Sequence, residues 1–175
     1  MKNIDWNQVE DLKDYNRIPA GGYICVITAV EDVPEKEYLK IEYDISNGDY
    51  RGYFKGLYLN KGFWGGSFVK SYKEKALPFF KAFKTAVEAS NPGYTYNNNE
   101  KTLVGKYVGL TLGEEEYLDK NNKIRTRTYV DQTHSAKAIQ AGEFEIPELK
   151  KIKASEPTPA FAPIPDGSSD PLPWE

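Results

Sequence analysis

Hydrophobic and polar residues alternate with a period of two along several stretches, most clearly over residues 38–45. The apolar members, which share one face, are Leu39, Ile41, Tyr43 and Ile45. Such alternation indicates a β-strand with one buried face. Similar patterns predict strands over residues 23–33 and 51–58, and a hairpin turn at Asn47 and Gly48, which tolerate positive φ.

The second half of the chain continues with a glycine-rich loop over residues 61–68 and a helix over residues 69–90. Pro78 must kink or restart that helix. Its apolar stripe, spaced as on one helix face, consists of Phe79, Phe80, Phe83 and Val87. Alternation then predicts strands over residues 107–117 and 123–130 around a turn at 119–122, and a helical turn over 135–140.

The predicted order is three strands, a helix and two strands, which makes the chain mainly β. We expect a five-stranded, OB-fold-like barrel with the helix between strands 3 and 4. The globular domain is predicted over residues 1–152, with 1–18 as a lid segment in which Trp6 packs on the domain. Six of the eleven prolines lie in residues 153–175, a stretch predicted to be disordered.

Composition narrows the possible functions. The net charge is −3 and Cys25 is the only cysteine, so neither a strongly basic protein nor a disulfide scaffold is indicated. We interpret Cys25 as a small buried residue and the single histidine, His134, as structural. The three consecutive glutamates from residue 114 are interpreted as a solvated strand end. Without a catalytic or metal-ligating constellation, we predict no enzyme activity, metal or cofactor.

Cations and aromatic rings share faces of the predicted third and fifth strands. The third strand carries Arg51, Tyr53 and Lys55, and the fifth carries Lys123, Arg125, Arg127 and Tyr129. Single-stranded nucleic acid is held by cations that follow the phosphates and by rings that stack on bases. The alternative is a solvated strand face whose charges prevent edge-to-edge aggregation. The stripes alone do not decide between these interpretations.

Two further aromatic residues lie between glycines in the loop at residues 61–68. We assign Trp64 to base stacking and Phe63 to the core at the open end of the barrel, and we add Tyr58 as a further stacking candidate.

The last residues of the chain combine acids, prolines and large apolar side chains. The predicted docking tip is Asp170, Pro171, Leu172, Pro173 and Trp174. Exposed apolar side chains on such a segment favour binding to a partner pocket.

The sequence resembles bacterial and phage single-stranded DNA-binding proteins, in particular a divergent group from phages of Gram-positive hosts. The resemblance covers most of residues 18–152 and lies in the stretches IPAGGY at 18–23, YDI at 43–45 with Gly48, and AGEFEIP at 141–147. It implies an OB-fold, single-stranded DNA as ligand, oligomerisation or cooperative binding along a strand, and recruitment of replication, recombination or repair proteins through the tip. Trp174 and Glu175 depart from the family's usual ending in phenylalanine.

We therefore expect a sequence-tolerant single-stranded DNA-binding protein, acting in the cytoplasm of a bacterial host cell. No hydrophobic run reaches the length of a membrane span, and residues 1–15 contain no signal-peptide pattern. One alternative is a protein-interaction module, such as a phage factor that binds a host enzyme without binding DNA. An enzyme acting on nucleic acid is the other alternative, but it lacks a constellation to perform catalysis.

Overall fold

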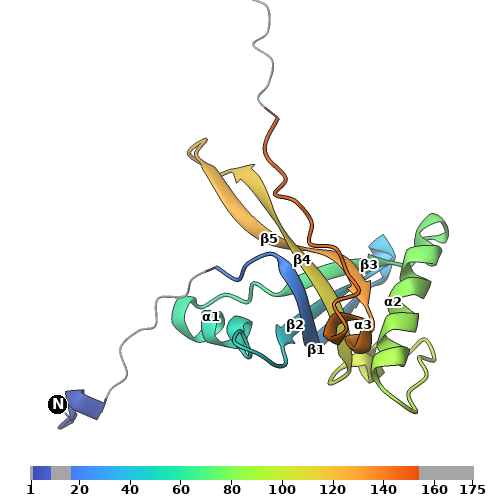
Figure 1. The fold of residues 1–175 in the computed structure, drawn as a ribbon, viewed down its shortest axis with the longest axis horizontal. Coiled ribbons are helices and arrows are strands. Elements are labelled where there is room, and N and C mark those ends of the chain that lie inside the picture. Colours follow the sequence, from blue (N-terminus) through green and yellow to red (C-terminus); the bar gives the residue numbers. More distant parts are fainter. Residues whose placement is uncertain (1, 9–16, 154–175) are drawn as a thin grey trace, which may run out of the picture.

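The protein is described by a computed structural model covering residues 2–8 and 17–153. Its centre is a five-stranded antiparallel sheet with strand order β3-β2-β1-β4-β5. The strands are β1 (Gly21–Val33), β2 (Tyr38–Ile45), β3 (Ser67–Ser71), β4 (Tyr107–Leu118) and β5 (Ile124–His134). The α-helices are α1 (Tyr53–Lys61), α2 (Leu77–Ser90) and α3 (Ala136–Gln140). In Figure 1, α1 and α2 flank the strands on opposite sides.

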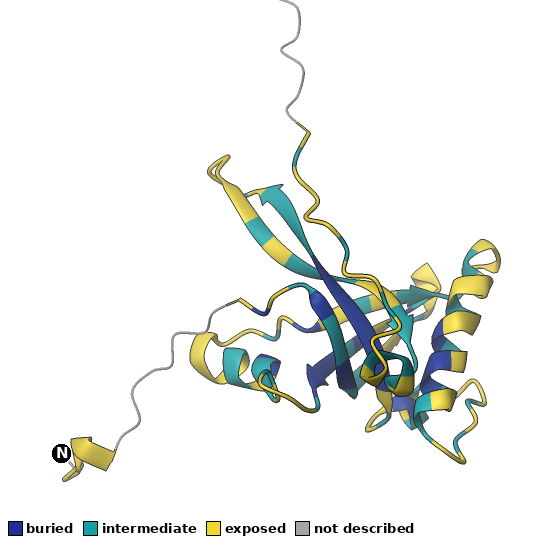
Figure 2. Cartoon of the chain, viewed as in Figure 1, coloured by how far each residue is buried: buried dark blue, intermediate teal, exposed yellow. Residues whose placement is uncertain are grey.

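The hydrophobic core confirms the alternation expected of the strands. The four apolar residues of the 38–45 run are buried, and so are Cys25 and Ile27 of β1. Figure 2 shows that buried residues concentrate in β1, β2, the first half of β4 and the inner side of α2. Burial also raises the pKa of the Cys25 thiol, which suits a packing residue better than a reactive one.

The predicted third strand over residues 51–58 is wrong, because α1 occupies most of this stretch. The turn does begin at Gly48, which has a φ of +78°. The amide of Gly52 donates to the carbonyl of Ile45 and starts a helix in place of a returning strand. The spacing of Phe54 and Leu57 suits this helix, because both side chains reach the loop at Gly65.

The third strand of the sheet lies instead in residues that were predicted to form a loop and the start of a helix. In β3, Phe68 and Lys70 alternate with Ser67, Val69 and Ser71. Lys70 lies over the rings of Phe68 and Phe83, with its Nζ 5.8 and 6.0 Å from their centroids. A lysine on the inner face conceals the apolar alternation of this strand. The helix consequently starts at residue 77, where proline stands in the first turn.

The helix between strands 3 and 4 is confirmed, as is the helical turn at residues 135–140. The order of the sheet leaves β3 and β5 as its two edges. Some Cα atoms of these edge strands approach within 8 Å of each other. The described residues contain no β3–β5 strand pairing, so the sheet is open as it stands.

The hairpin of β4 and β5 extends beyond β1 and projects from the body of the molecule (Figure 1). The β1–β4 pairing reaches only to Gly21 and Leu112, and residues 149–152 run along the free edge that follows. The Lys150 amide donates to the Glu114 carbonyl at 3.0 Å, and the Glu116 amide donates to the Lys150 carbonyl at 2.8 Å. This segment therefore extends the sheet locally.

The predictions for the two ends of the chain have different outcomes. Trp6, predicted to pack as a lid, is 67% exposed in the short turn Trp6–Gln8, so that prediction is wrong. The predicted disordered stretch 153–175 lies, except for Lys153, outside the described residues. The docking tip over residues 170–174 lies outside them as well.

Candidate nucleic-acid interface

An open hollow of about 540 Å³ lies between α1 and the outer face of β1 and β2. We call it the α1 hollow. Among the side chains that line it are Arg51, Lys55, Tyr58, Leu59, Trp64 and Tyr107. Four of these, all except Leu59 and Tyr107, were predicted from the sequence to bind nucleic acid. The structure therefore gathers four of the nine predicted residues, although a turn, a helix and a loop carry them instead of a strand.

The buried carboxylate of Asp44, on β2, holds α1 in place. Its Oδ1 accepts hydrogen bonds from the amides of Ile45 and Phe54, at 2.8 and 2.9 Å. Its Oδ2 accepts from the amide of Lys55 at 3.1 Å. The first amides of a helix have no partner inside the helix, and a carboxylate there also complements the helix dipole. Asp44 thus fixes the first turn of α1, which carries Lys55 and directly follows the turn with Arg51.

The ring of Trp64 is fixed within the hollow. Its Nε1 donates to the carbonyl of Gly66 at 3.0 Å, and its indole packs partly against the core. Tyr58 stands beside it, with ring centroids 6.4 Å apart and an interplanar angle of 53°. Tyr58 is 51% exposed, so part of its side chain is accessible to a ligand. Phe63, which was predicted to join the core, is instead 54% exposed, so that prediction is wrong.

Charge in the α1 hollow is positive on balance. Arg51 and Lys55 are exposed, and no ion pair is formed by either of them among the described residues. Asp44 is the only acid among the lining residues, and the backbone amides already occupy its oxygens. An anionic ligand would therefore meet two available cations and no competing carboxylate.

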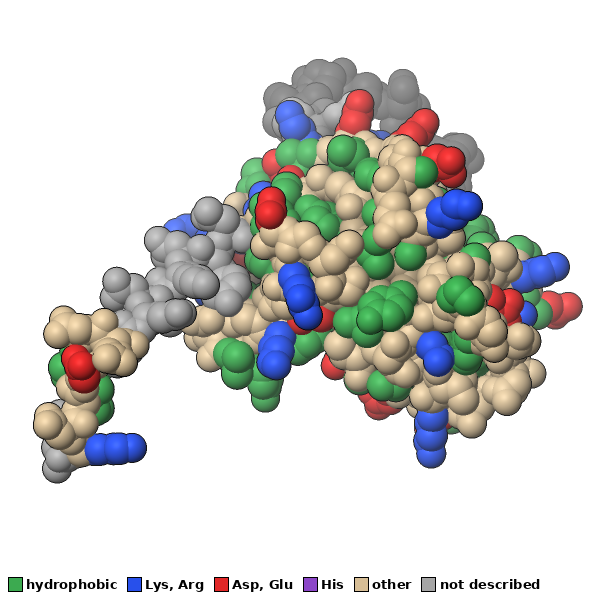
Figure 3. Space-filling model, turned by 60° about the horizontal axis from the view of Figure 1, so that its bottom comes forward, with side chains coloured by type: hydrophobic (Ala, Val, Ile, Leu, Met, Phe, Trp, Pro, Cys, Tyr) green, Lys and Arg blue, Asp and Glu red, His purple; other side chains and the backbone are tan. Residues whose placement is uncertain are grey.

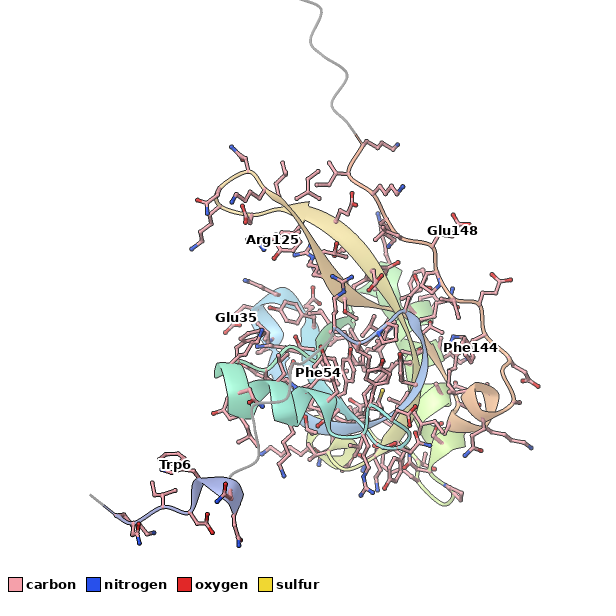
Figure 4. The ribbon with its side chains drawn as sticks, turned by 60° about the vertical axis from the view of Figure 1, so that its left-hand side comes forward. Trp6, Glu35, Phe54, Arg125, Phe144 and Glu148 are labelled. Carbon is pink, nitrogen blue, oxygen red and sulfur yellow. The ribbon has the colours of Figure 1, made fainter. Side chains whose placement is uncertain are left out.

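The cations of β5 are in a different situation, because acids of the same hairpin pair with them. Arg125 Nε lies 3.0 Å from Asp119 Oδ2, and Arg127 Nε lies 2.7 Å from Glu115 Oε1. The Lys123 amide, and then Arg125, lower the pKa of Asp119, so it stays charged beside its partner. Figure 4 shows Arg125 on the hairpin, away from α1 and the labelled Phe54. No β5 residue lines the α1 hollow.

Two of the predicted stacking residues serve the packing of the protein instead. Tyr53 contacts the rings of Tyr50 and Phe54, and its hydroxyl accepts a hydrogen bond from the Ile18 amide at 3.3 Å. The Tyr129 ring lies against Gly113, and Lys150 Nζ lies 3.9 Å from the ring centroid. The two predicted stripes therefore form no common groove in the described residues. The first lies on α1 and the turn before it, whereas the second lies on β5 and the turn before it, which do not line the α1 hollow.

Tyr107 is the aromatic lining residue that sequence reasoning missed. It is the first residue of β4, it is 47% exposed, and it pairs with Val26 of β1. Alternation had placed it on the outer face, opposite the buried Val108. This outward position next to Lys106 was the sequence signal that could have identified Tyr107 as a binding residue. What the sequence could not reveal is that α1 folds up to the same face.

The face seen in Figure 3 is not strongly basic. Its Lys and Arg side chains are scattered among hydrophobic and other side chains and form no large basic patch. In the described residues, no group of three or more His, Cys, Asp or Glu side chains is placed to hold a metal ion. The glutamates of the hairpin are engaged within the fold, since Glu114 pairs with Arg17 at 2.9 Å. His134 lies 3.5 Å from the hydroxyl of Thr111, which is buried.

Comparison with models of known protein families and with curated proteins finds no match to this chain. The family resemblance consequently depends on the short stretches of sequence named above. Within the described residues, each helix lacks either the length or the apolar character needed to span a membrane.

Proposed function

We propose that this chain is a single-stranded DNA-binding protein with an OB-type barrel, and that the α1 hollow is its main binding site. The observation that carries the proposal is the convergence of unpaired cations and available rings on one hollow. Arg51 and Lys55 supply the cations, and Tyr58 and Trp64 supply the rings. Cations that follow phosphates and rings that stack on bases are the two needs of sequence-tolerant binding.

The topology supports the OB-type assignment. A closed barrel of this order requires β3 to meet β5, and these are the edge strands that approach each other. The helix α2 lies between β3 and β4, as that plan requires. Under this proposal the β4–β5 hairpin is a secondary surface, because its arginines must leave acidic partners before they contact phosphates.

Titration of labelled oligothymidine at several salt concentrations tests the proposal. We expect binding that weakens by roughly 0.7 log units per log unit of salt for each phosphate contacted. Replacing Arg51 and Lys55 with glutamine should weaken binding and flatten this salt slope, because each supplies an unpaired charge to the hollow. Trp64 fluorescence should report the titration, since a stacked base changes its environment.

The matched control is the double replacement of Arg125 and Arg127 with glutamine, which removes the same charge from β5. We expect a smaller effect, because both side chains are already paired with acids. A larger loss from the β5 variant than from the α1 variant would move the site to the hairpin. Absence of binding in low salt would reject DNA binding altogether.

The segment that follows residue 153 completes the proposal. We assign its tip, residues 170–174, to recruitment of replication, recombination or repair proteins of the bacterial host. The acids of the tail would also compete weakly with DNA for the cations of the α1 hollow. Both roles are inferred from the sequence of the tail and from the family resemblance.

The alternative function is a protein-interaction module that does not bind DNA. Large apolar side chains that remain exposed favour it, notably Leu59 at 72% and Phe79 at 71%. Such side chains are common at protein interfaces. The same oligonucleotide titration separates the two functions, because this alternative expects no binding at any salt concentration.

A further inference from the structure

We infer that the path of a bound single strand continues from the α1 hollow, past Tyr107, into a second hollow lined by Tyr94 and Lys106. This inference rests on the proposed function and extends it. The second hollow has a volume of about 610 Å³ and lies where the end of α2 meets the start of β4. We call it the Tyr94 hollow.

Tyr107 connects the two hollows, because it lines both of them. Its backbone is held at both polar groups by the side chain of Asn91. The Tyr107 amide donates to Asn91 Oδ1 at 3.0 Å, and Asn91 Nδ2 donates to the Tyr107 carbonyl at 2.8 Å. An exposed ring on so fixed a backbone is a preorganised stacking surface, which loses little entropy on binding.

Lys106 and Tyr94 repeat the chemistry of the α1 hollow. Lys106 Nζ lies 4.7 Å from the centroid of the Tyr94 ring, a cation–π contact. No carboxylate stands within 4.0 Å of Lys106 in the described part of the chain. The Tyr94 hydroxyl is hydrogen-bonded to Thr102 Oγ1 at 2.9 Å, which orients the ring.

Two turns keep the Tyr94 hollow open. Gly93 and Gly105 line it with φ values of +81° and +83°, a region that other residues rarely adopt. An added Cβ at either glycine would meet no heavy atom within 4 Å, so the space above them is clear. The backbone of both turns is thereby accessible to a ligand.

The charges of the two hollows together favour an anionic occupant. Their lining includes Arg51, Lys55 and Lys106, against the single carboxylate of Asp44, which is occupied by backbone amides. An acidic peptide would satisfy the cations but would leave the three tyrosine rings and Trp64 unused. A single strand uses both, since phosphates and bases alternate along it. We therefore assign both hollows to one nucleic-acid strand.

The test is a series of oligothymidines of increasing length, from about 4 to 16 nucleotides, titrated against the full-length chain. The variants are Lys106→Gln and Tyr107→Leu, and the control is Lys120→Gln on the exposed turn between β4 and β5. We expect both variants to bind long oligonucleotides roughly tenfold more weakly than wild type. Binding of the shortest oligonucleotide should change less in Lys106→Gln, because Lys106 lines only the second hollow, whereas Tyr107 lines both. Lys106→Gln should also flatten the salt slope by about 0.7 for a lost phosphate contact.

The outcomes separate this inference from the proposed function. If wild type binds but its gain in affinity with length is the same in Lys106→Gln and Lys120→Gln, the second hollow is not used. If wild type does not bind oligothymidine at all, the proposed function itself fails. A polyglutamate peptide that binds wild type with the same dependence on Lys106 would assign the hollow to acidic peptides and overturn the inference.

Discussion

At the scale of single residues, Asp44 has the largest influence on the proposed site. It is 6% exposed on β2, yet its oxygens bind the amides that begin α1. The residue that precedes the helix, Gly52, has no side chain to cap it. The positions of Arg51 and Lys55 therefore depend on a carboxylate that lies seven and eleven places earlier in the chain.

Replacing Asp44 with alanine should lower the free energy of unfolding by about 2–3 kcal/mol, because buried amides lose their acceptor. Urea denaturation followed by tryptophan fluorescence measures this change. The same variant should weaken oligothymidine binding, since the first turn of α1 loses its anchor. The control is Asp49→Ala, an exposed acid nearby, which should change stability by no more than about 0.5 kcal/mol. Equal effects from the two variants would refute the anchoring role.

Individual cations also differ in how available they are to a ligand, because their neighbours in the fold differ. Arg51 has no acid partner among the described residues, whereas Arg125 and Arg127 each have one. Lys70 differs again, because its partial burial over two aromatic rings lowers its pKa by desolvation. Residue type alone does not distinguish these cases. The distinction comes from the neighbours that the fold supplies.

At the scale of elements, glycines in the sheet allow aromatic side chains from other segments to pack directly against the strand backbone. A Cβ on Gly22 would lie 2.5 Å from Cζ of Phe144, and one on Gly113 would lie 2.6 Å from Cζ of Tyr129. Figure 4 shows Phe144 next to β1. Gly22 and Phe144 belong to the first and the last of the stretches that carry the family resemblance. The structure brings these stretches, far apart in sequence, into contact.

The close fit predicts that Gly22→Ala destabilises the fold by about 1–3 kcal/mol through overpacking. In a Phe144→Ala background the same substitution should cost much less, because the methyl group then has room. A double-mutant cycle with urea unfolding measures this coupling. Additive effects of the two substitutions would show that Phe144 does not rest on Gly22 in solution.

At the scale of the whole molecule, the chain after α3 returns to complete the sheet. Residues 149–152 hydrogen-bond with the part of β4 that β1 leaves unpaired. Lys150 Nζ also lies over Tyr129, and the Ile152 amide donates to Glu116 Oε2 at 3.2 Å. Because an uncovered strand edge is prone to associate with other chains, this segment protects the hairpin.

A truncation series tests this arrangement together with the tail. A chain ending at residue 148 should be less stable than the full chain and more prone to aggregate, because it exposes the β4 edge. A chain ending at residue 153 retains the edge segment and should match the full chain in stability. It should bind oligothymidine equally or more tightly, since the acidic tail no longer competes, and it should lose capture of partner proteins.

Urea midpoints, light scattering and oligothymidine titration measure the three properties on the same samples. Equal stability of the chains ending at 148 and 153 would refute the role of the edge segment. A large loss of DNA affinity in the chain ending at 153 would refute competition by the tail and place part of the binding site after that residue.

The sequence by itself determined the elements whose pattern is local. The alternation of 38–45 predicted β2 and its buried face, and the turn at 119–122 predicted the hairpin of β4 and β5. These predictions succeed because strand periodicity and turn chemistry act over a few neighbouring residues. The structure confirms a mainly β protein with five antiparallel strands.

The tertiary structure decided what depends on distant partners. The weak alternation in residues 51–58 is compatible with a strand. The carboxylate of Asp44, however, binds the first amides of this stretch and stabilises it as a helix. The inward-facing Lys70 of β3 likewise obscured the strand pattern, because a lysine on the inner face depends on tertiary contacts. The rings that accommodate it come from β3 and α2. The candidate site follows these decisions. Arg51 and Trp64 meet Tyr107 only because α1 packs on the sheet, and no local pattern encodes that contact.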